Sequence, residues 1–336
     1  MTSALDSTSF ARVACPACGQ RLEHSAASAS CAGCGLTPQQ VGGVLDFLAS
    51  KTLTGRGEEV REFYEKRPFP GYADGDSASS MLDRGRDSPY LTALDAAIGP
   101  TASVLDCGCG TAQVATFLAL SGARRTVFGL DGCRASLAEA DRFRQRARIQ
   151  NLTLLRGDLF APPLTPGAFD VVQCRGVVHH TADPDRATRT VASLVAPGGI
   201  LLLGIYESMA RIPHRLRRGV GRLSFPLARR LDPVLRRRDL TQSKKDTWIE
   251  DQYRHPLEKM MPVPRSVRLL DALGFDWVRT LPPAVDEGHM FEPSPRPSSP
   301  GLWLRRAGWM LRGLNDADAG LICYVARKRG APPTGA

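Results

Sequence analysis

The chain has 336 residues, of which 43% are apolar and 23% are charged, so it can bury a sizeable core and is not disordered throughout. Its longest apolar runs, such as residues 200–205, fall far short of the roughly 20 residues that a membrane-spanning helix needs. Its start lacks the basic-then-apolar pattern of a secretory signal. We therefore expect a cytoplasmic protein without a transmembrane segment.

The formal net charge of +10 comes from one segment. Residues 211–245 contain 12 Lys and Arg but only 2 Asp and Glu, whereas the rest of the chain holds 32 residues of each sign. A nucleic acid or an anionic membrane would therefore meet this segment and not the protein as a whole.

Four of the nine cysteines form a regular cluster near the N-terminus. Cys15, Cys18, Cys31 and Cys34 follow the pattern C-x2-C-x12-C-x2-C, and a glycine follows each pair. Two residues between thiolates let one tight turn present both sulfurs to the same ion. The other five cysteines are scattered and odd in number, which disfavours a disulfide framework. The pattern predicts a zinc ribbon over residues 10–48. Because four protein ligands leave no open position, this Zn2+ would be structural.

From about residue 88, apolar strands alternate with helical stretches. We expect strands over 102–105, 126–130, 152–155, 169–173 and 199–205, with helices over 90–98, 112–121, 134–148 and 184–195. Further along the chain, residues 264–281 indicate a helix and then a strand, 281–302 an extended loop with six prolines, and 321–326 the last strand. Alternation of this kind is typical of an α/β fold with a parallel sheet covered on both faces.

A glycine-rich turn and three acids follow consecutive strands of this sheet. Gly108 and Gly110 lie between a strand and a helix, where a missing side chain lets a ligand approach the backbone. Asp106, Asp131 and Asp158 lie at the ends of the first three strands, so they should share one crevice. An acid after the second strand suits a ribose diol, and an acid after the third suits an adenine amino group.

This combination resembles the class I S-adenosylmethionine-dependent methyltransferases of the type 11/25 kind. The stretch from Val104 to Thr111 is similar to their first motif, although Ala112 replaces its third glycine. The segments 129–131, 157–159 and 169–184 resemble later motifs of the family, and residues 43–48 resemble the tail of the zinc ribbons that precede such domains.

The resemblance implies a Rossmann-like domain over residues 60–330 with a seven-stranded, mostly parallel sheet and a basic helical lid inserted at about 207–262. It also implies S-adenosyl-L-methionine as cofactor. The cofactor-binding residues that we expect are Asp106, Gly108, Gly110, Asp131, Gly132, Asp158, Leu159 and Arg175.

Residues near the expected methyl group are candidates for catalysis. His179 and His180 follow the fourth strand, and an imidazole can accept a proton from a hydroxyl or ammonium acceptor. Tyr206 follows the fifth strand and is a further candidate. The alternative is that these side chains only cap a loop or end a strand. For Tyr253, His255 and Glu258, contact with the substrate and a purely polar loop are equally favoured.

The basic segment carries apolar residues at steps of three or four, which form one helix face with arginines on the other. These residues are Ile212, Leu216, Val220, Leu223, Leu227, Leu231 and Leu235. Internal prolines and glycines predict two or three short helices. Three interpretations stay open: a solvated lid, a surface that meets an anionic membrane or lipid-like acceptor, and a contact with RNA phosphates.

The sequence thus predicts an S-adenosylmethionine-dependent methyltransferase that acts on a small molecule of secondary or lipid-related metabolism, by O-, N- or C-methylation. One alternative is a methyltransferase of rRNA or tRNA that uses the ribbon and the basic segment to bind RNA. Another is a scaffold that binds the cofactor without turnover, which the intact acids and glycines disfavour.

Overall fold

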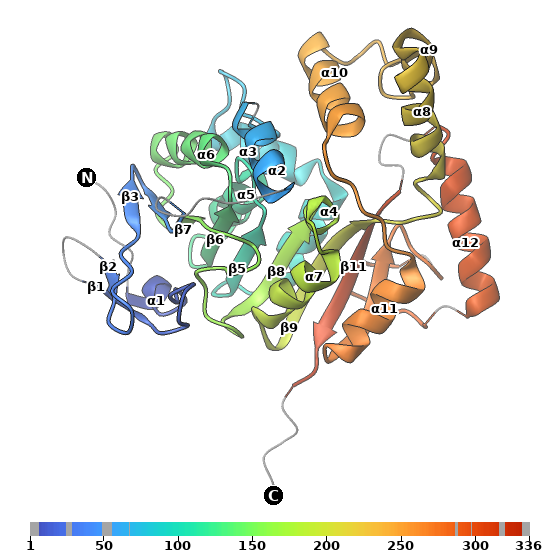
Figure 1. Ribbon diagram of the computed structural model, residues 1–336. Helices are drawn as coiled ribbons and strands as arrows, with labels where there is room; N and C mark the ends of the chain where they lie inside the picture. The colour runs from blue at the N-terminus through green and yellow to red at the C-terminus, as the bar shows by residue number, and fades with distance from the viewer. Residues whose placement is uncertain are drawn as a thin grey trace, which may run out of the picture.

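The computed structural model describes residues 7–24, 29–48, 56–66, 68–285, 288–296, 298–315 and 320–330. Its centre is a nine-stranded sheet in the order β10-β11-β9-β8-β5-β6-β7-β4-β3 (Figure 1). The strands of its larger part are β5 (Ser103–Cys107), β6 (Thr126–Asp131), β7 (Leu152–Arg156), β8 (Phe169–Arg175), β9 (Val195–Tyr206), β10 (Phe275–Leu281) and β11 (Leu321–Lys328). Only β11 runs antiparallel to its neighbours in this part. The prediction of a mostly parallel α/β sheet is confirmed.

The predicted count of seven strands is wrong, because a hairpin from the N-terminal region extends the sheet. This hairpin consists of β3 (Gln39–Val41) and β4 (Val44–Asp46), and β4 pairs in parallel with β7. Val44 and Asp46 are buried in this position. The hairpin covers an edge of β7 that would otherwise present unpaired backbone groups to solvent.

The sheet is covered on both faces, as its fully buried strands require. One face packs against α3 (Ala78–Arg86), α4 (Pro89–Ala97), α5 (Gln113–Ser121) and α6 (Arg134–Arg146). The other packs against α7 (Pro184–Ser193), α11 (Val263–Ala272), α12 (Ser299–Arg312) and the N-terminal cysteine region. Neighbouring residues within a strand serve opposite cores: Val104 faces the first set and Leu105 the second.

The N-terminal region also contains α1 (Ser7–Phe10) and a small separate hairpin of β1 (Leu22–His24) and β2 (Ala29–Cys31). Helix α2 (Arg56–Lys66) then leads to the main domain. Figure 1 shows the cysteine region beside β7 and the segment after β9 at the opposite end of the molecule.

The segment after β9 forms the predicted short helices, α8 (Ile212–Leu223), α9 (Phe225–Leu231) and α10 (Gln242–Ile249), followed by a π-helical turn, η2 (Glu250–Arg254). We refer to Ile212–Arg254 as the lid. Prolines stand in the first turn of α8 and α9, where no backbone N–H is needed. Most of the predicted apolar face points outward, and the exposed members are Ile212, Leu216, Leu223, Leu227 and Leu231, whereas Leu235 is buried. His214 and Arg217 are buried instead.

Part of the predicted extended loop 281–302 is helical, because α12 begins at Ser299. Ser298 caps this helix by accepting a hydrogen bond from Gly301 N–H, and Pro300 fits its first turn. A proline of this segment therefore lies at the start of a helix, although prolines in the interior of a helix interrupt it. Within the described residues, no helix is long and apolar enough to cross a bilayer.

Candidate active site

The glycine-rich turn after β5 packs too closely against its neighbours to accommodate side chains at its two glycines. Gly108 and Gly110 both have positive φ, at 69° and 54°. A Cβ atom on Gly108 would lie 2.3 Å from Cγ2 of Val177, and one on Gly110 would lie 2.3 Å from the carbonyl oxygen of Phe69. Glycine is therefore required at both positions, since a side chain would clash and the positive φ disfavours other residues.

The carboxylate of Asp131, at the end of β6, lies against this turn. Its Oδ2 accepts a hydrogen bond from Gly110 N–H at 2.8 Å, and its Oδ1 accepts one from Cys133 N–H at 2.8 Å. Each oxygen keeps further acceptor capacity. Two fixed donors therefore hold the carboxylate in one orientation beside Gly110, as a site for a ribose diol requires.

Asp106 is buried at the end of β5 in a chain of hydrogen bonds that the sequence did not indicate. Gln173 donates from Nε2 to Oδ1 of Asp106 at 3.1 Å, and the hydroxyl of Tyr90 donates to Oε1 of Gln173 at 2.7 Å. Burial, together with the charge of Asp131, raises the pKa of Asp106 to about 6, although the hydrogen bond from Gln173 opposes the shift.

The other predicted cofactor residues lie along the same edge of the sheet. Arg156 donates from Nε to the carbonyl of Gly132 at 3.1 Å, which fixes the backbone next to Asp131. Asp158 accepts a hydrogen bond from Phe160 N–H at 2.9 Å and Leu159 packs against the core. The guanidinium of Arg175 stacks on the ring of Tyr90 at 3.9 Å. The structure thus brings the ends of β5, β6, β7 and β8 together, as expected.

A segment to which the sequence assigned no role covers the glycine-rich turn. The carbonyl of Phe69 accepts a hydrogen bond from Thr111 N–H at 3.1 Å, and Gly71 N–H donates to the Thr111 hydroxyl at 3.3 Å. Upstream, Glu65 accepts from the N–H groups of Arg134 and Ala135 at the start of α6. The only sequence feature that could have indicated a role for this segment is the high content of aromatic residues and prolines in residues 63–72.

The candidate catalytic residues gather in a cluster of rings. The ring of His179 lies 3.9 Å from that of Tyr206 and 4.3 Å from that of His180. The ring of His255, from the segment after the lid, lies 3.7 Å from that of His180. Phe63 of α2 contacts His255 at 5.2 Å, so α2 and the segment after the lid approach each other at the ring cluster.

The imidazoles of this cluster are neutral at pH 7. Burial lowers the pKa of His179 well below its ordinary value, and it lowers the pKa of His180 to about 4 and that of His255 to about 3. His180 Nδ1 lies 2.8 Å from the carbonyl oxygen of Leu257. A carbonyl only accepts, so Nδ1 carries the proton and Nε2 carries the lone pair.

A buried ion pair supports the cluster from the lid side. Arg211 stacks on the ring of Tyr206 at 3.7 Å and pairs with Glu258 at 2.9 Å. Gln252 donates from Nε2 to the hydroxyl of Tyr206 at 3.1 Å. Of the three candidate substrate residues, His255 and Glu258 therefore adjoin the cluster. Tyr253 turns away, because its hydroxyl donates to Asp232 inside the lid at 2.8 Å.

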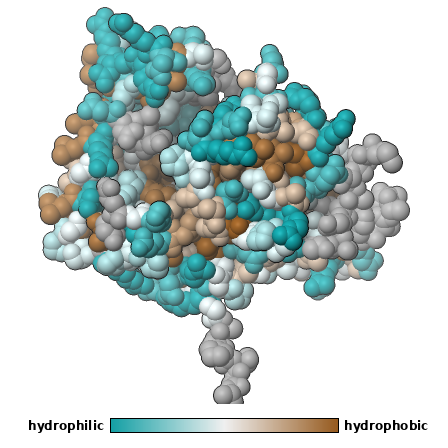
Figure 2. Space-filling model, turned by 180° about the vertical axis from the view of Figure 1, so that it is seen from behind, coloured by the Kyte–Doolittle hydropathy of each residue, from teal (hydrophilic) through white to brown (hydrophobic). Residues whose placement is uncertain are grey.

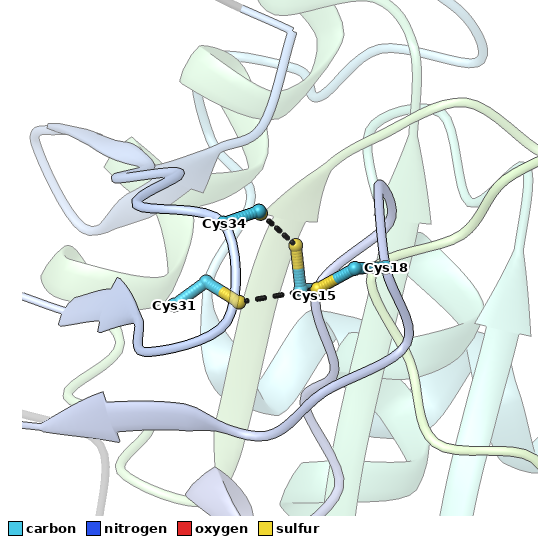
Figure 3. Close-up of side chains that lie close together, drawn as sticks. All are labelled: Cys15, Cys18, Cys31 and Cys34. Atoms are coloured by element: carbon cyan, nitrogen blue, oxygen red, sulfur yellow. Dashed lines mark hydrogen bonds between the residues drawn. The ribbon is translucent and has the colours of Figure 1, made fainter.

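The four clustered cysteines meet as the spacing predicts (Figure 3). Their sulfur atoms all lie within 4.8 Å of one another, with Cys15 and Cys34 at 3.5 Å and Cys18 and Cys31 at 3.4 Å. A tetrahedral Zn–S bond of about 2.3 Å implies sulfur separations of roughly 3.8 Å. The donor set and the spacing thus fit one tetrahedral ion, and none of the four is in a disulfide.

Comparisons with known proteins agree with this geometry. Residues 105–203 match the family model of a methyltransferase domain. An uncharacterized protein of Synechococcus is 30% identical over 226 residues, which are 60% of this chain and 54% of that protein. The ubiquinone biosynthesis O-methyltransferase of Chromobacterium violaceum is 38% identical over 98 residues, which are 29% of this chain and 40% of that enzyme.

Among solved structures, PKMT2 from Rickettsia typhi shares the fold, with a TM-score of 0.51 at 14% identity over 73% of this chain and 53% of that one. The chain spans between 36% and 54% of the lengths of the first three curated relatives. The match over 105–203 and the glycine-rich turn define a methyltransferase domain of the S-adenosylmethionine-dependent class. The predicted enzyme class is confirmed at the level of this domain.

Proposed function

We propose that the protein transfers a methyl group from S-adenosylmethionine to a hydroxyl group of a small, largely apolar acceptor. The observation that carries this proposal is the ring cluster of His179, His180, Tyr206 and His255, which lies under the lid at the ends of β8 and β9. A site enclosed by rings and a lid suits a small acceptor better than a base within folded RNA. The name of the O-methyltransferase relative from Chromobacterium violaceum supports the same acceptor atom.

The residues along the sheet edge fit the cofactor. Asp131 would hold the ribose hydroxyls, Asp106 the methionine ammonium, and Asp158 with Leu159 the adenine. The backbone at Gly108, Gly110 and Gly132 would lie against the ligand, with Arg175 at the end of the site. When bound, the cofactor supplies a methyl group activated by a sulfonium, so catalysis depends largely on holding the acceptor in line.

We assign the proton transfer to His180. His180 would accept the hydroxyl proton of the acceptor at Nε2 while the acceptor oxygen takes up the methyl group that the bound cofactor supplies. The Leu257 carbonyl holds the ring in the tautomer that this step needs. His179 and Tyr206 would form the wall behind it, and His255 and Glu258 the side nearest the lid.

The experiment that tests the proposal follows a labelled methyl group. The protein is incubated with cell extract and labelled S-adenosylmethionine, and the products are divided into organic-soluble, RNA and protein fractions. Label in the organic-soluble fraction supports the proposal. Label in RNA favours the rRNA or tRNA alternative, and cofactor binding without transfer to any fraction favours the scaffold.

Substitution of His180 separates the base from the cofactor site. His180→Gln should lower kcat by about 100-fold or more, the usual contribution of a general base, while the Kd for S-adenosylmethionine is unchanged. The exposed His289 offers a matched control, because His289→Gln should leave both constants unchanged. An unaltered kcat in His180→Gln would remove this residue from the mechanism.

We further propose that residues 10–48 form a ribbon around one structural Zn2+, bound by Cys15, Cys18, Cys31 and Cys34. The methyltransferase domain would span residues 60–330, with the lid insertion within 207–262. The four convergent sulfurs support the metal site. Metal analysis of the purified protein should find one zinc per chain.

A further inference from the structure

Five apolar side chains of the lid point to solvent rather than to the core. In α8, Ile212, Leu216 and Leu223 lie on one helical face, and Leu223 is 92% exposed. In α9, Leu227 and Leu231 are about half exposed. An isolated exposed leucine needs no explanation, but a row of them on consecutive helices marks a surface that another apolar phase covers.

A second exposed apolar row lies on α12. Trp303, Leu304 and Leu311 fall within one face of this helix, and each is more than half exposed. Arg217 donates from Nη1 to the carbonyl of Gly313 at 3.1 Å, which ties α8 to the end of α12. In Figure 2, hydrophobic side chains break the hydrophilic surface along the side where α12 and the lid lie. We call these two rows the apolar rim.

Cations border the apolar rim. Arg215 and Arg222 of α8 and Arg229 and Arg230 of α9 are exposed, and none of the four has an ion-pair partner within the described residues. Helix α12 contains no acid, and its Arg305 and Arg312 are exposed, whereas its third arginine, Arg306, pairs with the buried Glu207. The two acids of residues 211–245 do not offset this charge locally, because Asp232 is fully buried and Asp239 pairs with Arg237.

We propose that the apolar rim docks this protein on the surface of an anionic lipid bilayer. Exposed Leu and Trp side chains would enter the boundary between headgroups and acyl chains, while the flanking arginines meet anionic headgroups. A second copy of this chain fits less well, because it would bring like charges together. RNA phosphates would pair with the arginines but leave the exposed leucines and Trp303 without a role.

The position of the rim relates docking to the active site. Arg211 immediately precedes α8 and stacks on Tyr206, and η2 ends one residue before His255. The lid, which carries the first of the two rows, is therefore joined at both ends to the ring cluster. The inference does not rest on the proposed methyl acceptor, because vesicle binding is measured without turnover.

The test is cosedimentation of the full chain with vesicles. We expect binding to phosphatidylcholine vesicles that contain phosphatidylglycerol, much weaker binding to phosphatidylcholine alone, and a loss of binding at high salt. Leu223→Glu should weaken binding by at least about tenfold, since it removes an exposed leucine that would enter the bilayer and adds a charge that anionic headgroups repel. Val41→Glu, a similar change at an exposed residue of β3, should bind as the unmodified chain does.

A spectroscopic readout locates the contact. Trp303 is exposed, so its fluorescence should shift to the blue on addition of the anionic vesicles, and the shift should be absent in Trp303→Phe. No binding to anionic vesicles, or equal binding by Leu223→Glu and the unmodified chain, would overturn the proposal. So would a dimer that Leu223→Glu dissociates without any vesicle binding, or binding of RNA in place of vesicles. Unchanged cofactor affinity in Leu223→Glu would show that this variant is folded.

Discussion

Gly110 and Asp131 come from different strand ends, yet the N–H of Gly110 donates a 2.8 Å hydrogen bond to Oδ2 of Asp131. The turn that a cofactor would approach and the carboxylate that would bind its ribose are therefore one rigid unit. A second bond from Cys133 N–H to Oδ1 fixes the plane of the carboxylate. Because these groups are already fixed before the cofactor binds, less conformational entropy is lost on binding.

Asp131→Ala should weaken S-adenosylmethionine binding by at least about tenfold, because it removes both acceptors for the ribose and frees two backbone donors. Isothermal titration calorimetry measures this directly. Asp239→Ala changes an exposed lid carboxylate and should leave the affinity as it is. If Asp131→Ala binds the cofactor as tightly as the unmodified chain, Asp131 does not hold the ribose.

Asp106 should make cofactor binding depend on pH. Its pKa is raised to about 6, mainly by burial, so it is ionised at pH 7 and loses its charge as the pH falls through 6. A neutral acid no longer attracts the methionine ammonium, so the affinity should fall about tenfold between pH 7 and pH 5. Asp106→Asn should bind weakly at every pH and lack this dependence. A pH-independent affinity in the unmodified chain contradicts the assignment.

The buried imidazoles should make the fold sensitive to acid. The folded pKa values of His180 and His255, at about 4 and about 3, lie below the unfolded value near 6.5. Between these values the unfolded chain binds more protons. The stabilisation is therefore complete above pH 6.5 and is lost as the pH falls through the folded values.

Urea denaturation between pH 7 and pH 5 measures this effect, and the raised pKa of Asp106 acts in the opposite direction over the same range. The free energy of unfolding should decrease toward pH 5, and the slope should be smaller in His180→Gln than in the unmodified chain. His289→Gln should keep the full slope. An equal slope in His180→Gln and the unmodified chain would mean that His180 is not buried as a neutral group.

The ion pair between Asp46 and Arg156 joins the N-terminal hairpin to the main sheet. The two side chains meet at 2.9 Å and are both buried, and Arg156 also holds the Gly132 carbonyl beside Asp131. Asp46→Ala leaves a buried guanidinium without this carboxylate, which typically costs about 3–5 kcal/mol of unfolding free energy. Chemical denaturation measures this loss of stability. Calorimetry should also show weaker cofactor binding in this variant, because Arg156, which holds the Gly132 carbonyl, loses its partner.

Asp239→Ala removes an exposed ion pair and serves as the comparison, with almost no expected change in stability. Similar small effects of both substitutions would show that the hairpin contributes little to the fold.

Zinc removal should unfold the N-terminal region first. Cys15→Ser should lower the zinc content and destabilise the chain, since metal binding and folding are coupled in such sites. Cys323, buried in β11 and outside the cluster, is the control, because Cys323→Ala should keep the zinc. Full zinc content in Cys15→Ser would contradict the four-cysteine site.

Local patterns predicted most of the sheet, because each strand is a short apolar run between turn signals. The apolar run that begins at Phe169 is a clear example of such a strand, and the glycine-rich turn at Gly108 is a clear example of a turn signal. The total of nine strands could not be predicted, because nothing in the sequence of Gln39–Val41 indicates that the next strand, β4, pairs with β7. Pairing between distant segments depends on which edge is left open.

The lid shows a different limit. The spacing of the apolar residues predicted the helix face that carries Leu216 and Leu223, but not that this face points to solvent and away from the core. That direction depends on tertiary contacts such as the bond from Arg217 to Gly313. The chain from Tyr90 through Gln173 to Asp106 was missed for a related reason, because it links residues far apart in the sequence.

Calorimetric titration of S-adenosylmethionine into the unmodified chain tests the central claim most directly. The site geometry predicts saturable binding of one cofactor per chain, abolished or strongly weakened in Asp131→Ala and accompanied by methyl transfer into organic-soluble products of an extract. The absence of measurable binding at millimolar cofactor, from a chain shown to be folded, would contradict the account.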